Sequence, residues 1–129
     1  MSATILLVYR EKNINHFEDV STFLGFNHNV LDYCHDSKED SGPSFGTNSI
    51  YPDIIVYDSV GEELLTIDPY VSEQVETFAP KVAIVGNREL AKNDSGAHSD
   101  FSFFEDSLRP CSLAKKIELK YRDILSKIR

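Results

Sequence analysis

The sequence has little cysteine, no long apolar segment and no export signal, and each of these absences removes a class of protein. Two cysteines, Cys34 and Cys111, cannot build the disulfide framework of a small secreted domain. No apolar run approaches the roughly 20 residues that a membrane-spanning helix needs. The N-terminus MSATILLVYREK lacks a basic region followed by an apolar segment and a small-residue cleavage site. We therefore expect a cytoplasmic protein with reduced thiols.

The chain is acidic, but its charge is unevenly distributed. Its 129 residues, of which 41% are apolar, suit one domain (1–129) with a hydrophobic core. The formal net charge is −8, yet residues 112–129 carry six Lys or Arg and two acidic residues, so the remainder carries −12. An acidic body repels phosphate backbones, so we expect no direct nucleic-acid binding by this domain. We interpret the basic C-terminal segment as the solvated face of a last helix.

Three short apolar runs predict buried strands at Thr4–Val8, Ile54–Tyr57 and Val82–Val85. The runs are rich in β-branched residues and do not alternate with polar ones, which is typical of parallel strands covered on both faces. Asn29–Cys34 is expected to form another strand, which follows the first run in the chain.

Helical periodicity follows the first of these strands. Apolar residues recur at helical spacing from Ile14 to Leu24, with Asn13 or Asn15 available as the N-cap. Gly25 stands where a left-handed stop is expected at the end of that helix. The pattern predicts one helix between the first two strands.

The remaining connections are more polar. Residues 36–49 contain Gly and Pro and predict a loop, and 87–99 predicts only a weak helix. A helix is expected over 62–78, where Pro69 should break or restart it. A last helix is expected from Ser112, and the apolar residues on one of its faces are Leu113, Ile117, Tyr121, Ile124 and Ile128.

The fifth strand has two possible registers. We place it near Glu105–Leu108, because Arg109-Pro110 and the last helix then follow in order; a competing register uses Asp100–Phe104. Alternating strands and helices imply right-handed crossovers and a doubly wound sheet. The working site of such a sheet lies beyond the C-terminal ends of its strands. The residues expected at that edge are Tyr9, Arg10, Asp58, Gly86, Asn87 and Arg109.

Over nearly the whole chain, four segments resemble the strand ends of a response-regulator receiver domain. They are ILLVYRE (5–11), PDIIVYD (52–58), VAIVGN (82–87) and EDSLRPCS (105–112). The second puts Asp58 where a receiver has its phosphorylated aspartate. The resemblance implies an α/β fold, a three-layer, doubly wound, five-stranded parallel sheet of the flavodoxin or CheY type with strand order 2-1-3-4-5.

The positions that carry chemistry in receivers depart from that pattern. Tyr9 and Arg10 replace the acidic pair, so that only Glu11 and Asp58 remain to attract Mg²⁺, which prefers an octahedral shell of oxygens. Phosphoryl transfer needs that charge neutralisation. The switch hydroxyl and the lysine are also missing, and the positions hold Gly86, Arg109 and Pro110. We expect no aspartyl-phosphate cycle, no metal, no cofactor in this domain and no catalytic residue; the domain is not expected to be an enzyme.

Three roles remain open for Asp58. It can be a residual phospho-acceptor, as in a phosphorylatable receiver. It can form a fixed ion pair with Arg10 or Arg109 that holds the site in one state. It can also be a strand-end aspartate that accepts backbone hydrogen bonds in the following loop.

Within the receivers, three segments are similar to the N-terminal domain of FleQ- or FlrA-type flagellar master regulators, which are bacterial enhancer-binding activators. The segments are FLGFNHNVLDYC, VAIVGNREL and SLRPCSLAKKIELKYRDI. The resemblance implies a degenerate receiver followed by an ATPase domain and a DNA-binding domain, control of flagellar genes with sigma-54, and a response to cyclic di-GMP. The chain has no Gly-rich Lys-Ser/Thr phosphate loop, so ATP and nucleotide sites are expected outside it.

The histidines, cysteines and remaining aromatic residues are further candidates for binding chemistry. The four histidines (16, 28, 35 and 98) fit no metal-ligand spacing. Cys34 is expected near the core, and Cys111 at a helix start, where a reactive thiol is conceivable. The aromatic residues Phe101, Phe103 and Phe104 are either core contacts beside the fifth strand or part of a homodimer face with the last helix. A flavodoxin-like binder of a small anion, held by Arg10 and Arg109, is a further alternative.

Overall fold

The computed structural model describes residues 4–34, 52–62, 67, 69–87 and 101–127 of the chain. Along the chain, strands and helices alternate in the order β1 (Thr4–Tyr9), the short 3-10 helix η1 (Glu11–Asn13), α1 (Ile14–Gly25), β2 (Asn29–Cys34), β3 (Ile54–Asp58), α2 (Pro69–Phe78), β4 (Lys81–Gly86), β5 (Ser102–Glu105), α4 (Pro110–Lys120) and α5 (Arg122–Lys127). The predicted loop over 36–49 and the predicted helix over 87–99 lie outside the described residues, except for Asn87.

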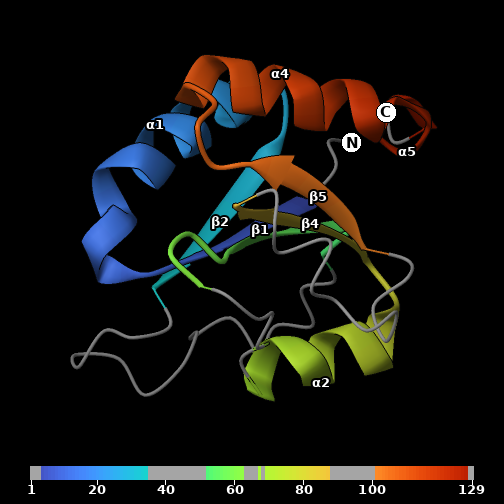
Figure 1. Ribbon diagram of the computed structural model, residues 1–129. Helices are drawn as coiled ribbons and strands as arrows, with labels where there is room; N and C mark the ends of the chain where they lie inside the picture. The colour runs from blue at the N-terminus through green and yellow to red at the C-terminus, as the bar shows by residue number, and fades with distance from the viewer. Residues whose placement is uncertain (1–3, 35–51, 63–66, 68, 88–100, 128–129) are drawn as a thin grey trace.

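The five strands form one parallel sheet in the order β2-β1-β3-β4-β5. Helices α1 and α4 cover one face of the sheet, and α2 lies on the other (Figure 1). This is the predicted doubly wound α/β architecture, with the predicted strand order 2-1-3-4-5. The three central strands are those with continuous apolar runs, because both of their faces are covered and, after the first residues of β1 and β4, every position is buried.

Alternate residues of the central strands divide the core into two clusters. Ile5, Leu7 and Val56 point toward α1 and α4, where they meet Phe17 and Leu113. On the other face, the cluster consists of Leu6, Val8, Ile55, Tyr57, Val82 and Ile84 with Val71 of α2. The division follows from the two-residue period of a strand, which sends successive side chains to opposite faces.

The fifth strand corrects one prediction. β5 spans Ser102–Glu105, so the preferred register at Glu105–Leu108 is wrong and the competing register, Asp100–Phe104, was nearer. Its residues pair with Ala83 to Gly86 of β4. In the sequence Pro110 favours the later register because it starts the following helix, but Asp106–Arg109 form a connection between the strand and that helix.

Two helix ends also differ from expectation. Gly25 is the last residue of α1 but is not left-handed, because the helical conformation continues into Phe26 (φ −64°, ψ −31°). The predicted last helix is interrupted at Tyr121 (φ −106°, ψ 24°) and divides into α4 and α5. Pro69 starts α2, in agreement with the expectation that it breaks or restarts the helix, but Glu62 and Ile67, which the prediction placed in the same helix, are not helical. No helix in the described part of the chain has both the length and the apolar character needed to cross a bilayer.

Candidate functional site

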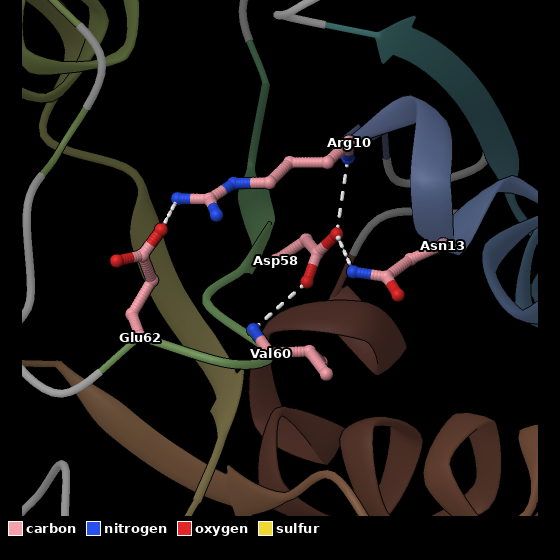
Figure 2. A network of polar contacts seen from close by, with 5 residues as sticks. All are labelled: Arg10, Asn13, Asp58, Val60 and Glu62. Carbon is pink, nitrogen blue, oxygen red and sulfur yellow. Dashed lines mark hydrogen bonds and ion pairs between the residues drawn. The ribbon is translucent and has the colours of Figure 1, made fainter.

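The carboxylate of Asp58 lies where the C-terminal ends of β1 and β3 meet (Figure 2). Asp58 is the last residue of β3 and is 0% exposed. Its Oδ2 accepts hydrogen bonds from the backbone N–H of Arg10 at 3.0 Å and from Nδ2 of Asn13 at 2.8 Å. Its Oδ1 accepts one from the backbone N–H of Val60 at 2.9 Å. Three neutral donors therefore fix both oxygens of the carboxylate.

The local backbone explains how these donors converge. β1 ends at Tyr9, Arg10 is extended (φ −98°, ψ 150°), and η1 then closes a turn in which the backbone N–H of Asn13 donates to the carbonyl of Arg10 at 2.9 Å. Asn13 precedes α1, as predicted for a cap, but its side chain makes no capping hydrogen bond. The amide of Asn13 instead reaches Asp58.

The guanidinium of Arg10 points away from Asp58 and forms an ion pair with Glu62 (Figure 2). Glu62 is the last residue of a turn that its backbone N–H closes by donating to the carbonyl of Ser59 at 3.1 Å. Gly61 supplies the left-handed conformation (φ 87°) that this turn needs. The backbone N–H of Ser59 donates to Val85 of β4 at 2.8 Å. The ion pair therefore ties the loop after β3 to the end of β1.

This geometry decides among the structural roles considered for Asp58. The predicted ion pair between Asp58 and Arg10 or Arg109 is wrong: Arg10 contributes its backbone amide, while its guanidinium binds Glu62. Arg109 is exposed and stands at the N-cap of α4, and no ion pair joins it to Asp58 within the described ranges. The bond from Val60 confirms that Asp58 accepts a backbone hydrogen bond in the following loop.

The other residues of the predicted edge serve the core or the loops. Tyr9 stacks on Phe17 with ring centroids 6.1 Å apart, and burial raises the pKa of its hydroxyl, helped by nearby Asp32. Gly86 is buried at the end of β4, and its carbonyl accepts the backbone N–H of Asp106 at 3.0 Å. Three further predicted residues lie at element ends: Glu11 begins η1, Asn87 follows β4, and Pro110 begins α4.

The groups around Asp58 do not fit the Mg²⁺ ion that the receiver resemblance implies. Mg²⁺ needs oxygen ligands, but the neighbours of the carboxylate present N–H hydrogens to it. The nearby Glu62 is already bound to Arg10. Among the described side chains, no three His, Cys, Asp or Glu residues lie close enough together to hold a metal ion.

Sequence reasoning missed two members of this network, Asn13 as a side-chain partner and Glu62. Asn13 carried a signal, since it is a polar residue just beyond the strand that precedes the expected site. Glu62 carried none, because its contact with Arg10 depends on the turn that Gly61 closes.

The aromatic residues near β5 contact the core. Phe101 and Phe103 pack against the cluster on the α2 face, and Phe104 packs against the cluster on the α1 and α4 face. All three are half-buried. They are therefore core contacts that keep partial exposure along an edge strand.

The described histidines and cysteines lie apart from one another. His28 lies 3.2 Å from Glu118 through its Nε2, and His16 meets the ring of Phe17 edge-on. Cys34 is half-buried against the core, as predicted, and Cys111 is exposed near the start of α4. His35 and His98 lie outside the described residues.

Comparisons with known proteins agree on the fold. The structure is similar to that of the response regulator DrrB from Thermotoga maritima, with a TM-score of 0.63 and 17% identity; the match covers 96% of this chain and 54% of DrrB. It is also similar to a receiver domain protein from Methanospirillum hungatei (TM-score 0.63, 13% identity, 98% of each chain). A receiver domain protein from Clostridium thermocellum gives a TM-score of 0.59 at 17% identity, with 95% of this chain and 98% of that one covered.

Sequence comparisons add nothing to this result: no protein-family model matches the chain, and no curated protein matches it. The chain spans about half of DrrB, which is 54% covered. The low identities show the architecture alone, and that architecture is the one found in CheY-like response-regulator receiver domains.

Proposed function

We propose that this chain is a receiver-like regulatory domain that works without phosphorylation of Asp58 and without a bound metal. The observation that carries the proposal is the environment of the Asp58 carboxylate, which is fully buried and held by three neutral donors. An aspartate in this setting stabilises one arrangement of the loops around it, so the domain would act through its surface.

The chemistry of phosphoryl transfer supports this view. A carboxylate oxygen must reach the phosphorus in line with the leaving group, and cations must neutralise the charge that develops on the phosphoryl oxygens. Here Oδ2 faces the backbone of Arg10 and the amide of Asn13, and the guanidinium of Arg10 is bound to Glu62. Gly86 at the end of β4 offers no hydroxyl to a phosphoryl group.

Incubation with acetyl phosphate, or with beryllofluoride, in the presence of Mg²⁺ tests the proposal. We expect no added mass by intact-protein mass spectrometry after acetyl phosphate and no chemical-shift change at Asp58 or Val60 after beryllofluoride. A phosphorylatable receiver domain serves as the positive control. A stable adduct on the wild-type chain that is absent in Asp58→Asn would support the alternative, a phosphorylatable two-component receiver.

We also propose the biological setting that the sequence resemblance suggests, namely the regulatory domain of a sigma-54-type flagellar transcription activator. In this proposal the domain restrains a following ATPase domain or promotes dimerisation, while ATP, DNA and cyclic di-GMP bind elsewhere in the longer protein. The reading frame beyond codon 129 tests the setting. We expect it to encode a Gly-rich Lys-Ser/Thr phosphate loop and then a helix-turn-helix, and a frame without them would contradict it.

A further inference from the structure

A cavity of about 370 Å³ lies at the opposite end of the sheet from Asp58. Its lining comes from the starts of β4 and β5 and from the junction of α4 and α5. The residues are Lys81, Ser102, Lys120, Tyr121, Asp123 and Ile124. Figure 1 shows α5 at the end of the molecule where β5 begins. The cavity therefore spans the sheet and the interrupted C-terminal helix.

Two lysines and one aspartate line this cavity, so its lining carries a formal charge of about +1 in an acidic chain. Lys81 and Lys120 are both exposed, and neither forms an ion pair with another residue of the described ranges. The formal net charge of the whole chain is −8, so two unpaired ammonium groups on one cavity stand out from their surroundings. Two ammonium groups on one cavity repel each other and attract an anion that binds near both.

One wall of the cavity is held by hydrogen bonds and is partly apolar. Tyr121 is 5% exposed, and its hydroxyl donates to the carbonyl of Val82 at 3.2 Å, which fixes the helix junction to β4. Ser102 forms a hydrogen bond with the same tyrosine. Ile124 adds an aliphatic surface, and the Asp123 carboxylate can accept hydrogen bonds from hydroxyl groups of a ligand. The lining thus offers two ammonium groups, a carboxylate and an apolar wall.

We propose that this cavity binds a small organic phosphate of about the size of a nucleoside monophosphate, with its phosphate between Lys81 and Lys120. Its volume is at the lower end of the roughly 300–1,000 Å³ typical of small-molecule sites, which suits one nucleotide better than a dinucleotide. The hydroxyl groups of the ligand face Asp123, and its apolar part lies on Tyr121 and Ile124. This site is separate from Asp58, so it does not depend on whether Asp58 is phosphorylated.

Such a ligand would act on the end of the chain. It would contact the sheet through Lys81 and the helix junction through Lys120 and Asp123, so binding would favour the arrangement in which α5 lies against the sheet. Binding of the ligand would therefore change the position of the C-terminal helix independently of Asp58.

Titration of the whole chain with adenosine 5′-monophosphate, followed by NMR chemical shifts, tests the site. We expect saturable shifts at Ser102, Tyr121 and Ile124 at millimolar concentrations, weaker binding of inorganic phosphate, and no binding of adenosine. The double variant Lys81→Gln/Lys120→Gln should bind at least about tenfold more weakly, because two charge-assisted contacts are lost. Lys115→Gln is the matched control, since Lys115 is an exposed lysine of α4 that does not line the cavity.

Several results would overturn the inference. One is the absence of saturable shifts with the wild-type chain. Others are equal affinity of the double variant, or an equal loss in Lys115→Gln, which would indicate a general charge effect. Inorganic phosphate that binds as tightly as the nucleotide would reduce the site to an ion site without a place for the organic part. Circular dichroism and thermal unfolding of each variant confirm that a loss of binding is not a loss of fold.

Discussion

The carboxylate of Asp58 accepts hydrogen bonds from Arg10, Asn13 and Val60, and this determines what its replacement does to stability. In a cluster of crowded carboxylates, replacing one by an amide relieves repulsion and stabilises the fold. At Asp58 we expect the replacement to destabilise the fold instead. An amide brings its own NH₂ group toward the donors, so Asp58→Asn should lower the free energy of unfolding by about 1–3 kcal/mol in urea denaturation. Asp19→Asn, at an exposed position of α1, is the matched control and should change little.

Asn13 separates this interpretation from a general effect of charge. Asn13→Ala keeps every charge but removes the 2.8 Å hydrogen bond from Nδ2 to Asp58. We expect a loss of about 1–2 kcal/mol in the free energy of unfolding, because the bond has a charged acceptor. Asn15→Ala changes an exposed asparagine two residues further along the chain, and it should lose much less free energy of unfolding. Equal losses in the two variants would show that the Asn13 contact contributes nothing specific.

The junction of α4 and α5 is an element whose stability should depend on pH. Burial raises the pKa of Tyr121, and the hydrogen bond with Ser102 partly offsets that rise. Because the folded pKa lies above the ordinary value of about 10, the neutral hydroxyl is favoured in the folded state. Its stabilising contribution is complete below that value and is lost as the pH rises through the folded pKa. Tyr121→Phe should therefore be less stable than wild type near neutral pH, by about 0.5–1.5 kcal/mol.

The difference between wild type and Tyr121→Phe should shrink as the pH rises above about 10, because the wild type must then bury a charge or open the junction. Urea denaturation of both proteins across that range measures it. Tyr9 also has a raised pKa, but it is present in both proteins and cancels in the comparison. A difference that stays constant with pH would contradict the assignment of the hydroxyl to the Val82 carbonyl.

The edge strand β5 and helix α4 form the face through which we expect dimerisation. A cavity of about 380 Å³ between them is lined by Phe103, Phe104, Glu105, Leu108 and Lys116. Phe103 and Phe104 also contact the core, so their substitution would disturb the fold and the face together.

Lys116→Glu changes an exposed residue of this face instead. We expect it to weaken the dimer by about tenfold or more in analytical ultracentrifugation, because it places an acid beside Glu105. Lys115→Glu should have less effect, and a wild-type chain that stays monomeric at high micromolar concentration would contradict the dimer.

The architecture of the whole molecule was largely predictable, whereas the contacts of its site were not. Continuous apolar runs revealed β1, β3 and β4, because strands covered on both faces leave no polar positions. β5 is short and half-buried, so its sequence could not fix its register, and Pro110 marked the next helix instead. The predicted topology correctly placed Asp58 at the C-terminal edge of the sheet. The partners of Asp58 and Arg10 depend on the turns of η1 and Gly61, which bring together residues far apart in the sequence.

A response to Mg²⁺ would be a property of the whole molecule, since an ion that binds only the folded state raises the free energy of unfolding of the entire domain. The wild-type chain presents N–H donors to Asp58 and holds Glu62 in an ion pair with Arg10. We therefore expect millimolar Mg²⁺ to leave the urea midpoint unchanged when NaCl keeps the ionic strength equal.

Arg10→Asp is the informative variant, because one substitution removes the guanidinium, frees Glu62 and adds a carboxylate near Asp58. Three carboxylates close together repel one another, so this variant should be less stable than wild type without the ion. Mg²⁺ supplies the missing positive charge and should restore part of that loss, with a midpoint that rises with the concentration of the ion. If the wild type gained as much from Mg²⁺ as Arg10→Asp does, the Arg10 guanidinium and its ion pair with Glu62 would not be what keeps the metal away.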